Sequence, residues 1–352
     1  MDSLVRSVLG EQEPAPAESF GSDQIKIVVV GVGGGGNNTV NRLIRSGVKG
    51  CELVAVNTDR QHLNMIHEKA KKILIGKTIT KGLGAGGYPD TGCKAAEMDR
   101  PLLEKELENA HLVFICAGMG GGTGTGASPV VAEIAKEQGA IVVSVVSIPF
   151  RLERARVQKA KWGLERLAAK SDTVIVIEND RLVSYVPNLP ITEAFNLADA
   201  ITGRAITGIA DTIMLPSLMN IDFADVKSVM ENGGFALLSM GEGHGPDRID
   251  QVVRNTLEQP LLDVSPEGAK GALLHISGGT QLTLGEGIEI GEKISSSFDL
   301  NADVKIGARL DPSLGDTVSC TAIVTGIKNP YIEAKKEADT RKVVEMDAIS
   351  YL

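Results

Sequence analysis

The chain has 352 residues, of which 43% are hydrophobic, 23% are charged and 3% are aromatic, and its formal net charge is -9. A chain of this length and apolar content can bury a large core and is expected to divide into two domains. The negative charge and the scarcity of aromatic residues argue against a nucleic-acid binder, which needs a basic surface and rings for base stacking.

Cysteine and histidine usage adds further exclusions. The four cysteines lack C-x-x-C spacing and the five histidines lack metal-ligand spacing, so we expect reduced thiols and no zinc site. No uncharged run reaches the length of a membrane span, and the first residues lack the apolar core of a signal peptide. These features predict a cytoplasmic protein without a direct membrane span.

The N-terminal half has an alternating pattern. Residues 1–22 are rich in Glu, Pro and Ala and are predicted to form a disordered arm. Apolar runs then occur at 25–30, 52–56, 72–75, 112–117, 140–148 and 173–178, separated by helix-length segments. Continuous apolar runs are typical of strands buried on both faces of a parallel sheet. We therefore predict a Rossmann-like α/β domain over 23–190, whose ligand lies beyond the carboxyl ends of the strands.

A first glycine cluster, from Gly31 to Asn38, follows the first predicted strand. Gly31, Gly33 and Gly36 satisfy the G-x-G-x-x-G pattern, so a dinucleotide-binding dehydrogenase is one alternative. That alternative requires an acidic residue at the end of the second strand, where Asp59 comes late. The long glycine-dense loop from Gly82 to Gly92 is interpreted either as a flap near a terminal phosphate or as an ordinary surface loop.

The most informative stretch covers residues 117–129, between an apolar strand and a helical segment. Five of the seven positions from Gly120 to Gly126 are glycine, so backbone N–H groups can approach an anion closely. Thr123 and Thr125 add hydroxyl donors, and the helix that follows favours phosphate at its start. No lysine follows the glycines, which excludes the G-x-x-x-x-G-K-[ST] loop. Two such cradles suit a nucleoside triphosphate better than a dinucleotide.

The C-terminal half has a different order of elements. A helix from Ile191 to about Leu215 lies between Pro190 and Pro216, and we interpret it as a central linking helix. Residues 216–328 then predict a smaller α+β domain, with helices near 222–230, 247–258 and 284–298 and strands near 234–240, 272–278, 303–308 and 317–326. Residues 329–352 form a charged tail.

The three glycine loops, in this order and spacing, resemble the FtsZ family, the tubulin-like GTPases of prokaryotic cell division. The resemblance extends from about Ile25 to about Ile327 and is strongest to the archaeal branch. It implies that GTP is bound by backbone groups of two segments and that Mg²⁺ bridges the phosphate oxygens without protein side chains. The implied residues are Gly33, Gly34, Gly35, Gly36, Asn37, Gly120, Gly121, Gly122, Thr123, Gly124 and Thr125.

The resemblance also implies contacts to the ribose and the base. Glu153 corresponds to the residue that accepts from a ribose hydroxyl. The family commonly has an arginine four residues later, where this chain has Val157, and Arg156 lies one position early. Asn179, Phe195 and Asp199 are the implied base contacts. A carboxylate at Asp199 accepts from guanine N1–H and the 2-amino group, a donor pair that adenine lacks.

The segment from Asn220 to Asp225 is implied to complete the active site of the next molecule in a head-to-tail filament. There Asp222 and Asp225 polarise the attacking water, and Asn220 contacts the nucleotide environment. An open filament follows from such a heterologous contact, so hydrolysis depends on assembly. Read without the resemblance, Asp222 is a helix N-cap.

In this family, a C-terminal tail connects filaments to membrane adaptors or other division proteins at mid-cell. Here residues 346–352 are interpreted either as a short apolar anchor for a partner or as a solvated tail. Two other functions are open. A cytoskeletal GTPase that sets cell shape would have the same biochemistry, and only localisation in dividing cells separates the two. A non-polymerising GTP-binding regulator conflicts with the intact acidic segment.

Overall fold

The computed structural model describes residues 25–181, 188, 190–214, 219, 221–258, 261 and 264–328. The side chains of residues 191, 192, 194–196, 198, 211 and 212 are not among the described ones. The predicted N-terminal arm, Asn220 and the C-terminal tail therefore lie outside the described residues.

The described strands form a single ten-stranded sheet in the order β3-β2-β1-β4-β5-β6-β7-β10-β8-β9. Strands β1 to β6 pair in parallel, β7 joins β6 in parallel, β10 pairs antiparallel with β7 and β8, and β9 is parallel to β8. The strands are β1 (Ile27–Val32), β2 (Cys51–Asn57), β3 (Lys71–Leu74), β4 (Leu112–Gly118), β5 (Ile141–Ile148), β6 (Thr173–Glu178), β7 (Gly234–Gly243), β8 (Gly271–Gly278), β9 (Asp303–Leu310) and β10 (Val318–Thr325).

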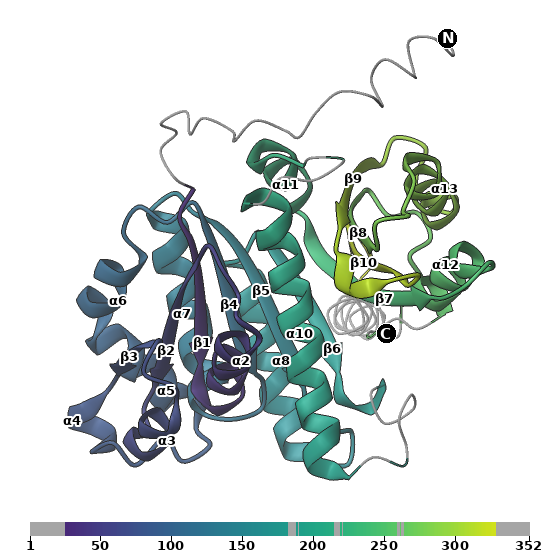
Figure 1. Ribbon diagram of the computed structural model, residues 1–352. Helices are drawn as coiled ribbons and strands as arrows, with labels where there is room; N and C mark the ends of the chain where they lie inside the picture. Colours follow the sequence, from purple (N-terminus) through teal and green to yellow (C-terminus); the bar gives the residue numbers. More distant parts are fainter. Residues whose placement is uncertain are drawn as a thin grey trace, which may run out of the picture.

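Helices cover both faces of the sheet (Figure 1). One face packs against α2, α10 and α11, and the other against α5, α6, α7, α8, α12 and α13. The helices are α2 (Gly33–Ser46), α3 (Arg60–Met65), α4 (Lys77–Thr80), α5 (Pro89–Met98), α6 (Arg100–Leu107), α7 (Thr123–Glu137), α8 (Arg154–Ala168), α10 (Ile191–Met214), α11 (Phe223–Met230), α12 (Arg248–Glu258) and α13 (Leu284–Ser295), with a short 3₁₀ turn η1 (Pro312–Leu314).

Strand β1 shows why the apolar runs of the first domain are continuous. Ile27 and Val29 belong to the hydrophobic core on the α2 and α10 face, whereas Val28, Val30 and Val32 belong to the core on the α7 face. Successive strand side chains point to opposite faces, and both faces here are dry. The predicted parallel α/β architecture with a C-terminal α+β region is confirmed.

The extent of the glycine-rich loop within residues 117–129 differs from the prediction. Helix α7 already begins at Thr123 and contains Pro129, so half of the stretch predicted as a loop is helical. Close packing against α5 explains the glycines there, because a Cβ at Gly126 would lie 1.9 Å from the carbonyl oxygen of Pro89. Glycine is therefore required at Gly126 by helix packing rather than by a loop conformation.

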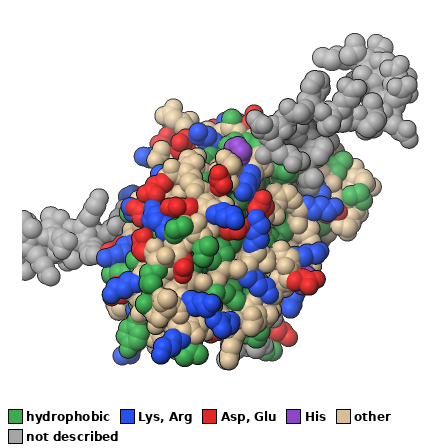
Figure 2. All heavy atoms as spheres, turned by 90° about the vertical axis from the view of Figure 1, so that its left-hand side faces the viewer, with side chains coloured by type: hydrophobic (Ala, Val, Ile, Leu, Met, Phe, Trp, Pro, Cys, Tyr) green, Lys and Arg blue, Asp and Glu red, His purple; other side chains and the backbone are tan. Residues whose placement is uncertain are grey.

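Surface charge is mixed. Figure 2 shows basic and acidic side chains interspersed over the face that carries α3, α4 and α6, without a continuous basic patch on that face. Of the helices that the structure describes, none has the length and apolar character that crossing a membrane would take.

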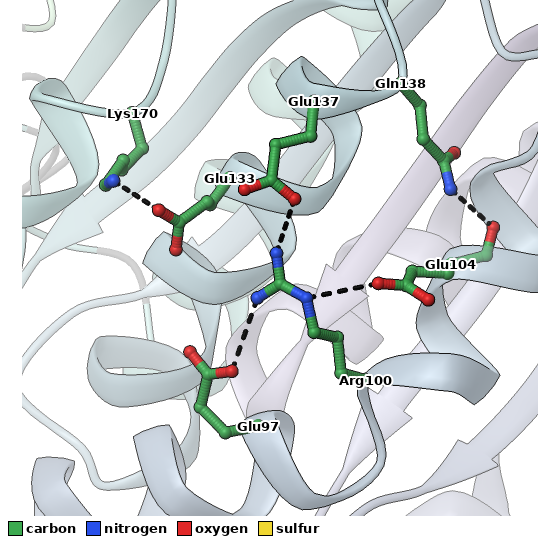
Figure 3. Close-up of polar contacts among 7 residues, drawn as sticks. All are labelled: Glu97, Arg100, Glu104, Glu133, Glu137, Gln138 and Lys170. Atoms are coloured by element: carbon green, nitrogen blue, oxygen red, sulfur yellow. Dashed lines mark hydrogen bonds and ion pairs between the residues drawn. The ribbon is translucent and has the colours of Figure 1, made fainter.

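An ion-pair network joins helices α5, α6 and α7 (Figure 3). The Arg100 guanidinium at the start of α6 lies 3.3 Å from Glu97 of α5, 3.1 Å from Glu104 of α6 and 2.5 Å from Glu137 of α7. These carboxylates are well exposed, and exposed pairs contribute little individually. The network links neighbouring helices of the outer layer and lies away from the functional site.

Candidate functional site

A cavity of ≈ 1210 Å³ opens beyond the carboxyl ends of the parallel strands. Each glycine-rich segment of the sequence contributes to its wall. The lining residues are Gly34, Gly35, Asn38, Thr39, Asn57, Asp59, His62, Gly84, Ala85, Gly87, Ala117, Gly118, Met119, Gly121, Gly122, Thr123, Gly124, Val145, Ser147, Pro149, Phe150, Leu152, Glu153, Arg156, Ile177, Asn179, Asp180, Asp199 and Thr202.

Two helix N-termini meet at this cavity. Helix α2 begins at Gly33 after β1, and α7 begins at Thr123 after β4, and among the described residues no side chain caps either of them. The first N–H groups of a helix have no partner within the helix, and the dipole makes that end attractive to anions. Two such ends facing one cavity are an arrangement that favours an anion such as phosphate and does not require a lysine.

Because glycine has no side chain, these helices can pack close to the sheet and the cavity stays open. A Cβ at Gly36 would lie 1.9 Å from the carbonyl oxygen of Cys116, so any larger residue would push α2 away from β4. Gly121 is different, since no atom lies within 4 Å of the position its Cβ would occupy. The first glycine permits packing, and the second leaves space for a ligand.

The predicted phosphate-binding residues separate into two groups. Gly34, Gly35, Gly121, Gly122, Thr123 and Gly124 line the cavity, whereas Gly33, Gly36, Asn37, Gly120 and Thr125 do not. The fully buried Thr125 hydroxyl accepts a hydrogen bond from the Gly120 N–H at 2.8 Å. The Thr125 hydroxyl thus holds the loop through its oxygen, and its predicted role as a donor to the ligand stays a prediction.

The glycine-dense loop from Gly82 to Gly92 is anchored next to the other two glycine-rich segments. The Gly84 N–H donates to the Thr58 carbonyl oxygen at 3.1 Å, and the Thr58 and Thr123 hydroxyls lie 2.7 Å apart. On the far side, Lys159 Nζ donates to the Gly87 carbonyl oxygen at 2.6 Å. Gly84 and Gly87 reach the cavity wall, so this loop is part of the site rather than an unrelated surface loop. Its predicted motion as a flap stays a prediction.

At the opposite end of the cavity lie two of the three predicted base contacts. Asn179, directly after β6, is 8% exposed, and its Oδ1 has no hydrogen-bond partner within the described structure. Asp199 projects from α10, where its Oδ1 accepts a hydrogen bond from the Thr39 hydroxyl at 3.2 Å. The side chain of Phe195 lies outside the described residues. A buried amide oxygen without a partner and a half-buried carboxylate that line the same cavity form an arrangement that a polar ligand would complete.

Asp199 has an unusual protonation equilibrium. Burial raises its pKa from 3.8 to about 6, and the hydrogen bond from Thr39 and the positive charge of Arg42 lower it in part. A raised carboxyl pKa is typical of functional sites, because desolvation is tolerated where a ligand provides the missing hydrogen bonds.

The predicted ribose contact, Glu153, has hydrogen-bond partners within the protein. Glu153 accepts from the Phe150 N–H at 3.2 Å through Oε1 and from Arg156 Nη1 at 2.5 Å through Oε2. Both side chains line the cavity, and the Arg156 side chain is 55% exposed. The shifted arginine therefore pairs with the glutamate at the rim of the cavity.

The acidic segment lies away from the cavity. Asp222 is the N-cap of α11, and Asp222 and Asp225 form a reciprocal capping box in which each side chain accepts from the other's backbone N–H. Phe223 contacts His111 edge to face at 6.1 Å between ring centroids, and His111 precedes β4. The two acids therefore lie near the amino ends of the strands. Figure 1 shows α11 near the top of the view and α3 and α4 near the bottom, at the other ends of the strands.

Several lining residues were not predicted as site residues from the sequence. Asn38, Thr39, His62, Ser147 and Thr202 all reach the cavity. Asn38 and Thr39 directly follow the glycines, and Thr202 comes three residues after Asp199 on the same helix, so proximity to predicted residues was a usable signal. Asp59 also lines the cavity, although the sequence suggested it only as a doubtful ribose acceptor in a dehydrogenase. Nothing in the sequence marks His62 or Ser147.

A parallel sheet with two uncapped helix starts, a half-buried carboxylate and a buried amide at one cavity defines a nucleoside triphosphate-binding protein. Residues 26–187 match the family model described as "Tubulin/FtsZ family, GTPase domain", and residues 234–328 match "FtsZ family, C-terminal domain". The chain belongs to the Tubulin/FtsZ family, and it is a GTPase of that family.

Individual relatives agree with the family models. The chain is 56% identical to "Cell division protein FtsZ 2" of Methanocaldococcus jannaschii over 321 residues, covering 90% of this chain and 84% of the relative. The solved structure "FtsZ dimer, empty (M. jannaschii)" superimposes with a TM-score of 0.82 at 43% identity, covering 92% of this chain and 91% of that one. "CetZ2 from Haloferax volcanii", at 22% identity, has a TM-score of 0.76, covers 92% of this chain and 99% of its own, and shows the fold alone. The predicted likeness to archaeal FtsZ proteins is confirmed.

Proposed function

We propose that this chain binds GTP in the cavity, assembles head to tail into filaments of a cell-division ring, and hydrolyses GTP with acids supplied by the next subunit. The relatives named cell-division proteins support the cellular role, and the neighbour named an FtsZ dimer supports self-association. The GTP-binding region is 23–190, the linking helix 191–215 and the C-terminal region 216–328. The tail at 329–352 would contact adaptors or other division proteins in the cytoplasm at mid-cell.

We assign lining residues of the cavity to each part of the nucleotide. The helix starts at Gly34 and Thr123 would hold phosphates, Glu153 and Arg156 the ribose, and Asn179 and Asp199 the guanine base. Among the described residues, no group of three or more His, Cys, Asp or Glu side chains is placed to hold a metal ion. Mg²⁺ would therefore be held mainly by the phosphate oxygens, where it neutralises charge that develops during phosphoryl transfer.

The observation that carries this proposal is the separation between the nucleotide cavity and the acidic pair. Asp222 and Asp225 do not line the cavity of their own chain. They lie near the amino ends of the strands, whereas the cavity lies beyond the carboxyl ends. A head-to-tail neighbour brings these two ends together, so each complete site would contain two chains. Phosphoryl transfer needs positioning and electrostatic stabilisation of an attacking water, which carboxylates can supply.

The dependence of GTPase rate on protein concentration tests this division of the site. We expect almost no hydrolysis below a threshold concentration and a superlinear rise above it, with light scattering or sedimentation showing polymer at the same threshold. A monomeric enzyme would instead give a rate proportional to protein at every concentration. A dilute subunit that hydrolyses GTP as fast per molecule as a concentrated solution would contradict the shared site.

The pKa of Asp199 predicts how GTP affinity depends on pH. The ionised carboxylate accepts two hydrogen bonds from guanine, and the protonated form cannot accept both. Affinity should therefore be constant well above pH 6 and fall below about pH 6, where the empty site takes up a proton. Equilibrium titrations should show the ratio of parental to Asp199→Asn affinity decreasing by up to about tenfold per pH unit in that range. Phosphate titration affects both proteins equally and cancels, and a ratio that stays constant from pH 7 to pH 5 would contradict the assignment.

A further inference from the structure

The acidic segment is fixed to the edge strand β9. Met219, which precedes the segment, forms two backbone hydrogen bonds with Ala308: its N–H donates at 3.3 Å and its carbonyl oxygen accepts at 3.2 Å. Strand β9 is thus the described element that sets where the chain enters the segment. Any side chain of β9 that also contacts the acids can control their orientation.

Lys305 of β9 makes that contact. Its Nζ lies 3.1 Å from Asp225 Oδ1, while Asp225 Oδ2 accepts from the Asp222 N–H at 3.3 Å. Both carboxylate oxygens of Asp225 therefore have a partner, one from the cap of its own helix and one from a neighbouring strand. The Lys305 and Asp225 side chains are 28% and 35% exposed, so this pair is shielded more than an ordinary surface pair.

The same lysine also pairs with a second acid. Lys305 Nζ lies 3.1 Å from Asp303 Oδ1, and Asp303 Oδ2 accepts from the Ser228 hydroxyl of α11 at 2.7 Å. Asp225 and Asp303 therefore share one cation, and Asp222 is joined to them through its capping box with Asp225. Hydrogen bonds from Lys305 to Asp303 and to Asp225 raise the pKa of the lysine, which stays protonated at neutral pH.

We propose that Lys305 is a positioning residue for hydrolysis, which holds the Asp225 carboxylate in the orientation needed to polarise water in the site of the next subunit. This inference rests on the proposed two-chain active site. Lys305 would not touch the nucleotide itself. Without it, repulsion from Asp303 and the loss of the Oδ1 partner would leave Asp225 free to rotate out of line with the water.

The test compares Lys305→Met with Lys305→Arg in the full-length chain. We expect Lys305→Met to lower kcat per polymerised subunit by about 10- to 100-fold, the range that misplacement of a catalytic group produces. GTP affinity should stay near the parental value, because the lysine lies outside the cavity. The assembly threshold is measured in parallel, so that an effect on filament contacts is separated from the effect on kcat. Lys305→Arg, which keeps a cation in reach of both acids, should restore most of the rate.

Lys227→Met is the matched control. Lys227 lies on α11 two residues after Asp225, is 50% exposed, and pairs with Glu231 at 4.0 Å rather than with the acidic pair. The substitution removes the same charge close to Asp225, on α11 rather than on β9, and should leave kcat unchanged. A double-mutant cycle adds a second criterion, since Lys305→Met should cost little further rate once Asp225 is replaced by asparagine.

Three outcomes would overturn the positioning role. The first is a kcat of Lys305→Met within twofold of the parental value. The second is an equal loss of kcat when Lys305→Met is added to Asp225→Asn. The third is a loss of GTPase rate that a higher assembly threshold explains entirely. If Lys305→Met does not fold, Lys305→Gln is judged by the same criteria. A fully active Asp225→Asn variant would reject the proposed water-polarising acid, whereas an inactive Asp225→Asn with normal Lys305→Met would reject only this inference.

Discussion

Replacing Asp225 with alanine or asparagine is expected to remove most GTP turnover while leaving GTP binding and assembly intact. A group that acts on the attacking water contributes about 100-fold or more to the rate, and the phosphates do not depend on it for binding. Steady-state GTPase assays, nucleotide titration and sedimentation would measure these quantities separately.

Asparagine is the sharper of the two Asp225 variants. Its side-chain oxygen can still accept from the Asp222 N–H, so the capping box that begins α11 can survive. What is lost is the negative charge, and with it the bond to Lys305 weakens. Turnover at the parental rate by a folded Asp225→Asn polymer would show that this carboxylate does not polarise water.

Replacing Asp199 with asparagine is expected to change the preferred nucleotide from GTP to XTP. The asparagine oxygen can accept from xanthine N1–H, and its amide N–H can donate to the xanthine 2-carbonyl oxygen, which replaces the 2-amino group of guanine. Hydrogen bonds to charged groups contribute about 1.5–3 kcal/mol each, so GTP affinity should fall about 10- to 100-fold. The Thr39 hydroxyl can still donate to the new amide oxygen, which preserves the local structure.

Competition binding with both nucleotides checks this exchange. Asp250→Asn, on α12 where Asp250 pairs with Lys293, is a suitable control because it makes the same chemical change outside the cavity. It should leave the preference for GTP intact. If Asp199→Asn gains no XTP affinity relative to GTP, Asp199 does not read the base.

Much of the architecture could be predicted from local patterns. Each predicted strand and helix of the described chain is present, because apolar periodicity reports directly on which faces are buried. Helix α10, bounded by Pro190 in the sequence, spans Ile191–Met214 as predicted from its flanking prolines. The glycine clusters were predictable site elements for the same reason, since they follow strands whose carboxyl ends share one edge of the sheet.

Residue-level roles were less accessible. The sequence predicted Thr125 as a ligand donor but not that its hydroxyl oxygen accepts from the Gly120 N–H, which depends on a backbone path that composition does not reveal. Lys305 resembles any other lysine on an amphipathic strand until β9 is placed beside α11. Likewise, the raised pKa of Asp199 requires knowledge of burial and of its partner Thr39, which is 160 positions away in the chain.

The sequence by itself determined the order of strands and helices, the position of the glycine loops and the family to which the chain belongs. Only the tertiary structure decided that the strands of both halves form one sheet, joined where Thr173, Val174 and Ile175 of β6 pair with β7. It also placed the cavity beyond the carboxyl ends of the parallel strands and the acidic pair near their amino ends. The reason is physical: side-chain periodicity encodes local burial, whereas strand neighbours and ion pairs arise from contacts between distant segments whose pairing no local pattern specifies.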